Sequence, residues 1–171
     1  AEQGTSFFGA YDLALPKDMT FIGQPLWGSI GYTLPATLGT QMADPNRRNI
    51  LLIGDGSLQL TVQELSTMIR QDIKPIIFVI NNDGYTVERL IHGMEETYND
   101  IRMWDYKALP KVFGGDNVVV HDVKTSNDLQ NVFDAIKAAP EQLHFTEVTM
   151  KWDDAPQTLR DISKSFANQN K

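Results

Sequence analysis

Two short polar turns combine residue types suited to binding a metal ion and a diphosphate. The first has the sequence Gly-Asp-Gly-Ser at residues 54–57, and the second has Asn-Asn-Asp-Gly at residues 81–84. Asp55 and Asn82 carry hard oxygen donors, which Mg²⁺ prefers, and the carbonyl of Gly84 can supply a third protein ligand. Mg²⁺ completes its octahedron with phosphate oxygens and water. The two turns together therefore predict a magnesium-diphosphate site.

The segments before these turns should bring them together. Residues 49–53 and 75–80 are apolar runs with the length of buried strands, and each runs directly into one of the turns. Because ligands bind beyond the carboxyl ends of parallel strands, both turns should lie at one edge of the sheet. Taken singly, each is a common turn sequence, in which Asp55 would cap a helix and Asn82 would stabilise its own turn. Their placement after consecutive strands favours the binding site.

The rest of the chain alternates between strand-like and helix-like segments, which predicts a three-layer α/β/α fold with a central parallel sheet. Thr61 and Glu64 form a capping-box pattern, so a helix is expected to begin there. Thr125 or Ser126 should cap another helix. No linker is visible, so residues 1–171 are expected to form one domain. Further strands are expected at 118–123 and 144–150, further helices at 30–43, 87–92, 125–139 and 156–166, and an irregular segment at 94–103.

Composition excludes several classes of function. The net charge of −7 argues against nucleic acid and anionic membranes as partners. The chain has no cysteine, so it has no disulfide, zinc–thiolate site or cysteine nucleophile. Neither a P-loop nor a strand followed by Gly-x-Gly-x-x-Gly is present. With no signal-like N-terminus and no apolar run of roughly 20 residues, a cytoplasmic location is expected, and the missing initiator Met suggests a fragment.

These motifs resemble those of the thiamine-diphosphate-dependent 2-oxo-acid decarboxylases, the pyruvate, indolepyruvate and branched-chain enzymes. Asp55 and Asn82 stand 27 positions apart, as in the thiamine-diphosphate motif of that family. Residues 2–6, 24–33 and 58–64 are also similar, and the resemblance covers essentially the whole chain. It implies the thiamine-diphosphate-binding fold, and it implies that the chain is the C-terminal domain of a three-domain enzyme.

The resemblance also implies thiamine diphosphate and Mg²⁺ as cofactors, and a role for each matching residue. The Gly28 carbonyl would accept from the amine of the pyrimidine ring, and Ile30 would bend the cofactor. Glu88 would be the catalytic carboxylate that handles protons, and Val87 and Ile91 would shape the substrate pocket. Asp55, Asn82 and Gly84 would hold the metal. The complete cofactor-binding set would be Gln3, Thr5, Gly28, Ser29, Ile30, Asp55, Gly56, Ser57, Asn82, Gly84, Tyr85 and Thr86.

Without the resemblance, Glu88 reads equally well as an exposed glutamate in the first turn of a helix, where the helix dipole favours it. His92 is interpreted as a structural residue at the end of the same helix. His121 and His144 are expected to have no special role. Each of these readings is open to test by the structure.

The family resemblance carries expectations about substrate and partners. Gln3, Val87, Ile91 and the Phe7–Phe8 pair favour aromatic or branched-chain 2-oxo acids of the indolepyruvate type, which the enzyme would convert to aldehyde and CO₂. The pyrimidine-binding domain of a neighbouring subunit would complete the site, in a homo-oligomer that is a dimer or tetramer. The isolated chain would then be inactive. Two alternatives stay open: a related carboligase similar to acetohydroxyacid synthase, and a non-catalytic metal- or phosphate-binding module.

Overall fold

A parallel sheet forms the centre of the protein, seen here in a computed structural model that describes residues 1–169. Its four strands have the order β1-β2-β4-β3. Each lies within two residues of a predicted segment, so the predicted strands are confirmed. The strands are β1 (Ile50–Gly54), β2 (Ile76–Asn81), β3 (Val119–Val123) and β4 (His144–Thr149).

Helices surround this sheet, and they include a short one at residues 5–10 that the sequence pattern did not predict. The α-helices are α1 (Thr5–Ala10), α2 (Thr33–Ala43), α3 (Asp55–Thr61), α4 (Glu64–Arg70), α5 (Thr86–His92), α6 (Leu109–Val112), α7 (Ser126–Ala138) and α8 (Gln157–Gln169). Two short 3₁₀ helices are η1 (Thr97–Asn99) and η2 (Tyr106–Ala108). Among residues 1–169, no helix combines the length and the apolarity needed to cross a bilayer.

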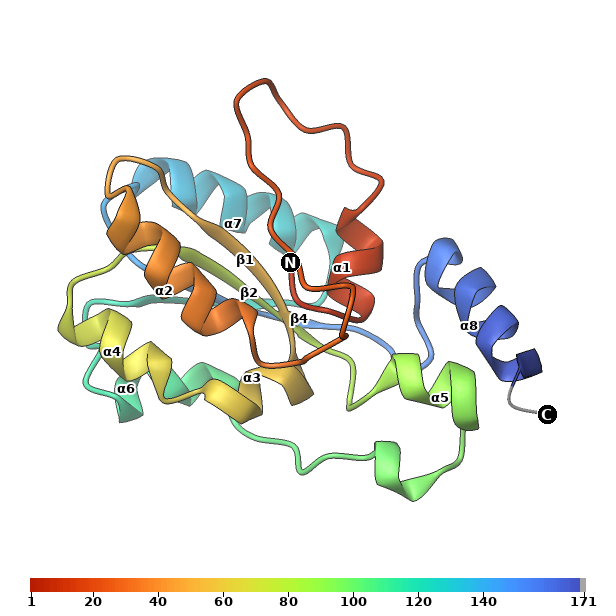
Figure 1. Cartoon of the computed structure of the whole chain (residues 1–171). Coiled ribbons are helices and arrows are strands. Elements are labelled where there is room, and N and C mark those ends of the chain that lie inside the picture. The colour runs from red at the N-terminus through yellow and green to blue at the C-terminus, as the bar shows by residue number, and fades with distance from the viewer. Residues whose placement is uncertain (170–171) are drawn as a thin grey trace.

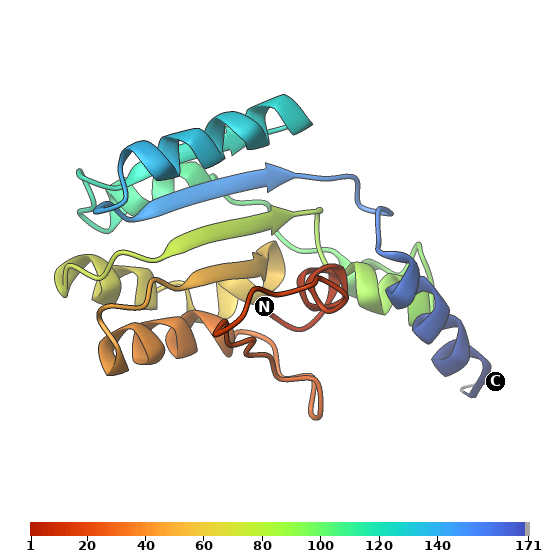
Figure 2. The same cartoon turned by 90° about the horizontal axis from the view of Figure 1, so that it is seen from above.

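The two faces of the sheet bury separate apolar clusters, because side chains alternate along each strand. Leu51 and Ile53 join a cluster that includes residues of α2, α3 and α4. On the opposite face, Phe78 packs with Val132 of α7. Figures 1 and 2 show α2 and α7 on opposite sides of the strands. The predicted three-layer α/β/α fold is therefore confirmed.

The start of one predicted helix is wrong. The helix after β1 begins at Asp55 and not at Thr61, and Glu64 starts a second helix without a side-chain cap. Thr61 instead donates its hydroxyl to the Gly31 carbonyl at 2.9 Å. Since that hydroxyl bonds to another segment of the chain, no capping box forms. The predicted cap at Thr125 is confirmed as a capping box, in which the Thr125 hydroxyl accepts from the Asp128 N–H and the Asp128 carboxylate accepts from the Thr125 N–H.

The carboxyl ends of the strands point to one edge of the sheet. In Figure 2 the arrowheads of β2 and β4 face the side of the molecule where α5 and α8 lie. Helix α8 packs against α5 and α1 there. This edge therefore collects α5 from the middle of the chain, α1 from its start and α8 from its end.

Candidate functional site

The two polar turns meet at this edge. Strands β1 and β2 are neighbours, with Gly54 paired to Ile80, so the turns leave the sheet side by side. The Gly84 N–H donates to Asp55 Oδ2 at 3.0 Å, and the Gly56 N–H donates to Asp55 Oδ1 at 2.8 Å. Asp55 is therefore held by both turns at once, with only 1% of its surface exposed.

Hydrogen bonds fix which way the Asn82 amide faces. Its Nδ2 donates to the Thr86 hydroxyl at 2.8 Å and to the Thr5 hydroxyl at 3.3 Å. The Thr86 hydroxyl donates its own hydrogen to the Trp152 carbonyl at 2.9 Å, so toward Asn82 it can act only as an acceptor. The side-chain oxygen of Asn82 is consequently left available to a ligand.

This donor set fits Mg²⁺ bound together with a diphosphate. Asp55, Asn82 and Gly84 offer a carboxylate, an amide oxygen and a carbonyl, all hard ligands. Residues 1–169 contain no cluster of three His, Cys, Asp or Glu side chains that could hold a metal by themselves. Phosphate oxygens and water would have to complete the coordination, which is the usual arrangement for Mg²⁺.

The electrostatics of Asp55 also favour a cation. Burial raises the pKa of Asp55 from 3.8 to about 6, although backbone N–H groups of Gly84, Gly56 and Asp83 lower it. A carboxylate that is costly to ionise without a partner becomes a strong ligand once a cation is present, because the cation compensates for the lost hydration.

Asp55 should give the metal-free chain a distinct dependence of stability on pH. Its pKa is raised on folding, so the folded chain holds this proton more tightly than the unfolded chain. The protonated Asp55 therefore stabilises the fold fully below about pH 4, and this stabilisation is lost as the pH rises through about 6. The free energy of unfolding should fall by about 3 kcal/mol over that range. Thermal unfolding in a chelator between pH 4 and pH 7 should show a decline that Asp55→Asn lacks. Equal slopes in the two proteins would contradict this expectation.

A cavity of about 510 Å³ opens beside the two turns. Ser29, which the resemblance assigns to the cofactor, does not line it; the segment that carries it contributes the neighbouring Gly28 and Ile30. The other expected site residues all do: Gln3, Thr5, Gly28, Ile30, Asp55, Gly56, Ser57, Asn82, Gly84, Tyr85, Thr86, Val87, Glu88 and Ile91.

Several polar side-chain atoms of residues at the wall of this cavity are buried without a hydrogen-bond partner among residues 1–169. They include Gln3 Oε1, Ser6 Oγ and Ser163 Oγ. Such atoms are rare in folded proteins and are expected where a ligand supplies the missing bond. They support a polar ligand in this cavity.

Packing also requires a glycine at position 56, in addition to the close approach of a ligand. A Cβ built there would collide with the ring of Tyr85. The ring lies against the backbone of the first turn and so helps to pack it against the second. Gly28, with φ of +61°, occupies the left-handed region that favours glycine.

Glu88 lies in the first turn of α5 and contributes to the cavity wall. Its side chain is about half exposed and its Oε2 lies 3.3 Å from Nε2 of His92, one helical turn further on. His92 is thus a neighbour of the candidate acid, a contact that the sequence interpretation did not include. Val87 and Ile91 lie on the same helix and line the cavity with it.

The sequence interpretation missed two groups of residues at this site. Helix α8 adds Leu159, Ile162, Ser163 and Phe166 to the cavity wall. Its amphipathic pattern predicts an apolar face, but nothing in the pattern shows what that face covers.

The second missed group is the buried anchor of the N-terminal segment. Glu2 is fully buried, and its carboxylate accepts hydrogen bonds from the Thr33 N–H at 3.1 Å and the Thr33 hydroxyl at 2.9 Å. Its own N–H donates to the Leu52 carbonyl at 2.8 Å. These bonds fix the position of Gln3 and Thr5. A glutamate near the start of the chain carries no sequence signal for that role.

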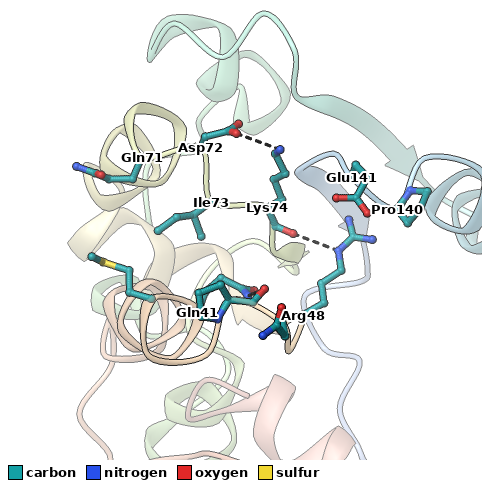
Figure 3. A pocket seen from close by; sticks show the side chains of 11 residues that line it. Gln41, Arg48, Gln71, Asp72, Ile73, Lys74, Pro140 and Glu141 are labelled. Carbon is teal, nitrogen blue, oxygen red and sulfur yellow. Dashed lines mark hydrogen bonds and ion pairs between the residues drawn. The ribbon is translucent and has the colours of Figure 1, made fainter.

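A slightly larger cavity, of about 550 Å³, lies at the opposite edge of the sheet, next to the residues that precede β1, β2 and β4. Figure 3 shows Arg48, Lys74 and Asp72 bonded within the protein. The Arg48 Nε donates to the Lys74 carbonyl at 3.1 Å, and Lys74 pairs with Asp72 at 3.0 Å. None of the expected site residues lines this cavity. The chemistry therefore points to the smaller cavity.

Comparison with known proteins agrees with this geometry. Residues 4–148 match the family described as thiamine pyrophosphate enzyme, C-terminal TPP binding domain. The chain belongs to this family. Thiamine pyrophosphate is another name for thiamine diphosphate, so the expected fold and family are both confirmed.

Relatives of this thiamine-diphosphate domain are named as decarboxylases. It is 48% identical over 169 residues to an alpha-keto-acid decarboxylase of Mycobacterium bovis, covering 99% of this chain and 30% of that protein. It is 49% identical over 175 residues to a pyruvate decarboxylase of Aspergillus terreus, covering 99% of this chain and 31% of that protein. The chain thus spans about a third of the length of these curated relatives.

A solved structure gives the same picture. The thiamine diphosphate-dependent 4-hydroxybenzoylformate decarboxylase of Rhodococcus jostii RHA1 superposes with a TM-score of 0.75 at 27% identity. The match covers 90% of this chain and 29% of that one. The thiamine-diphosphate domain therefore shares its fold with part of a larger decarboxylase.

Proposed function

We propose that this domain binds Mg²⁺ and the diphosphate of thiamine diphosphate within a non-oxidative 2-oxo-acid decarboxylase. The observation that carries the proposal is the meeting of the two turns, which brings Asp55, Asn82 and Gly84 together in the wall of one cavity. The decarboxylase names of the relatives support the reaction class.

Within this proposal, the residues of the chain bind and orient the cofactor. Ser57 and the N–H groups of Val87 and Glu88 in the first turn of α5 would bind phosphate oxygens, helped by the partial positive charge of that helix end, while the Tyr85 N–H is bonded to the Asn99 carbonyl. The Gly28 carbonyl and Ile30 set the pose of the organic part, as the family resemblance implies. Thiamine diphosphate, when bound, supplies the electron sink for the loss of CO₂. Glu88 holds and delivers the proton that replaces the lost carboxylate.

The substrates that we propose are aromatic or branched-chain 2-oxo acids, of which indolepyruvate is an example. Val87 and Ile91 line the cavity with side chains of modest size, and α8 adds the apolar side chains of Ile162 and Phe166. The solved relative from Rhodococcus is named for an aromatic 2-oxo acid, which agrees with this assignment.

We further propose that the pyrimidine-binding domain of a neighbouring subunit covers the mouth of the cavity. Leu26 and Trp27 are 91% and 88% exposed, directly before Gly28 and close to Ile30. Large apolar side chains left this open next to a binding cavity are typical of a surface that another protein covers. The active enzyme would then be a homo-oligomer.

Calorimetric titration with thiamine diphosphate tests the proposed function. Heat of binding is expected with Mg²⁺ present and not in a chelator, whereas binding that ignores Mg²⁺ would contradict the proposed site. A decarboxylation assay with indolepyruvate, phenylpyruvate and pyruvate then tests the partner. The isolated chain should form no aldehyde, and aldehyde formation by it would show that the neighbouring domain is not needed.

A further inference from the structure

The turn that carries the Gly84 carbonyl has positive φ angles at two successive residues. Asp83 has φ of +59° and Gly84 has φ of +112°. Glycine adopts such angles freely, and aspartate tolerates them better than most residues but still favours negative φ. The contacts that hold this turn therefore decide where the Gly84 carbonyl points.

Arg89 makes the strongest of these contacts from the side of α5. Its Nη2 donates to the Asp83 carbonyl at 2.6 Å and to Asp100 Oδ1 at 2.8 Å. The guanidinium lies 5.3 Å from the ring centroid of Trp152, within the range of a cation–π contact. Arg89 is only 4% exposed, so water competes little for these bonds.

The turn is enclosed from both sides. Asp55 accepts from the Gly84 N–H, and the Asn99 carbonyl accepts from the Tyr85 N–H at 3.0 Å. A Cβ on Gly84 would lie 2.5 Å from the Asn99 oxygen and 3.0 Å from Arg89 Nη2. The turn thus lies between Asp55 on one side and the guanidinium and the Asn99 carbonyl on the other.

The burial of Arg89 has an energetic cost. Its Nη1 is buried without a hydrogen-bond partner in the described part of the chain, and an unpaired buried donor is unfavourable. The ion pair with Asp100 offsets only part of that cost, because the Asp100 side chain is 63% exposed. An apolar side chain of similar length would avoid this cost, but it would not form the hydrogen bond to the Asp83 carbonyl.

We propose that Arg89 is a positioning residue for the metal site. Its bond to the Asp83 carbonyl keeps the turn in the left-handed conformation that aims the Gly84 carbonyl at Mg²⁺, and Asp100 orients the guanidinium. This inference rests on the proposed function, since it takes Gly84 as a metal ligand. Arg89 itself does not line the cavity, so it acts through the turn and not as a ligand.

Three variants and one matched control test it on the whole polypeptide that carries this chain. Arg89→Met should weaken Mg²⁺ binding at saturating thiamine diphosphate about tenfold or more, the size typical of residues that orient metal ligands. Arg89→Lys, which keeps one donor for the Asp83 carbonyl, should recover most of that loss. Asp100→Asn should cost about two- to threefold, since a charge-assisted partner is replaced by a neutral one. Arg48→Met, which removes a guanidinium bonded to two carbonyls at the opposite edge of the sheet, should leave Mg²⁺ binding unchanged.

Calorimetry gives the Mg²⁺ affinity, and amide hydrogen exchange of Gly84 and Tyr85 without ligand gives the state of the turn. Exchange at both amides should be faster in Arg89→Met and near normal in Arg89→Lys. Wild-type affinity in Arg89→Met, or equal losses in Arg89→Met and Arg48→Met, would overturn the proposal. If Arg89→Met does not fold, the other two variants carry the test. Wild-type Mg²⁺ affinity in Asp100→Asn, together with a tenfold or greater loss of Mg²⁺ affinity in Arg89→Lys, then overturns the proposal. If the wild-type protein binds no Mg²⁺ with thiamine diphosphate, the proposed function fails, and unchanged exchange in the Arg89 variants would then separately refute the holding of the turn.

Discussion

Replacing Asp55 with alanine should abolish Mg²⁺-dependent binding of thiamine diphosphate. Asp55 is the charged member of the three proposed ligands, and it also accepts hydrogen bonds that join the two turns. We expect affinity to fall about 100-fold or more, beyond the roughly 10–100-fold typical of residues that only support ligands. Calorimetric titration of the cofactor in the presence of Mg²⁺ measures the change.

Asp72→Ala is the matched control for this variant. Asp72 is an exposed aspartate that pairs with Lys74 at the far edge of the sheet. Its replacement should leave cofactor affinity within about twofold, because it lies far from the two turns. It should also change the fold little, because exposed ion pairs contribute little to stability. Unaltered binding in Asp55→Ala would remove the main support for the metal site and would favour a non-catalytic module.

Glu88→Gln should separate binding from catalysis. Glutamine keeps the size of the side chain but cannot deliver a proton, so kcat for aldehyde formation should fall about 10²- to 10⁴-fold. Cofactor affinity should stay within about twofold, because the Glu88 carboxylate lies beside His92 and is not among the groups that hold the two turns together. Release of CO₂ by the whole polypeptide and calorimetry of the cofactor give the two quantities.

Glu95→Gln is the corresponding control. Glu95 is an exposed glutamate shortly after α5 and does not line the cavity. It should retain wild-type kcat. If Glu88→Gln also retains wild-type kcat, Glu88 is only the exposed first-turn glutamate that the helix dipole favours.

The sequence predicts β1 and β2 well because they are short apolar runs that end in distinct turns, whereas β3 and β4 mix polar and apolar residues. Ile76 to Val79 are all buried, so their sequence has no surface positions to obscure the pattern. The placement of Asp55 and Asn82 follows from the same logic, since neighbouring parallel strands must end at one edge. The site residues on these turns could therefore be found without the structure.

Elements that depend on tertiary contacts escaped prediction. Helix α1 has six residues, too few to be stable alone, and it forms through packing on β1 and α8. Helix α3 begins at Asp55 directly after β1, although two glycines flank that residue. Arg89 looks like any arginine on a helix, and only the fold shows its bond to Asp83. The roles of α8 and Glu2 likewise come from contacts between distant parts of the chain.

The cavity that α1, α5 and α8 enclose also has a consequence for folding. Its wall joins Gln3 near one end of the sequence to Phe166 near the other, so it exists only after the longest loop of the chain has closed. Contacts between such distant residues form late and slowly. A ligand that binds only the closed cavity favours the completed fold by mass action. Terminal helices, which otherwise open first, would then gain protection from that ligand.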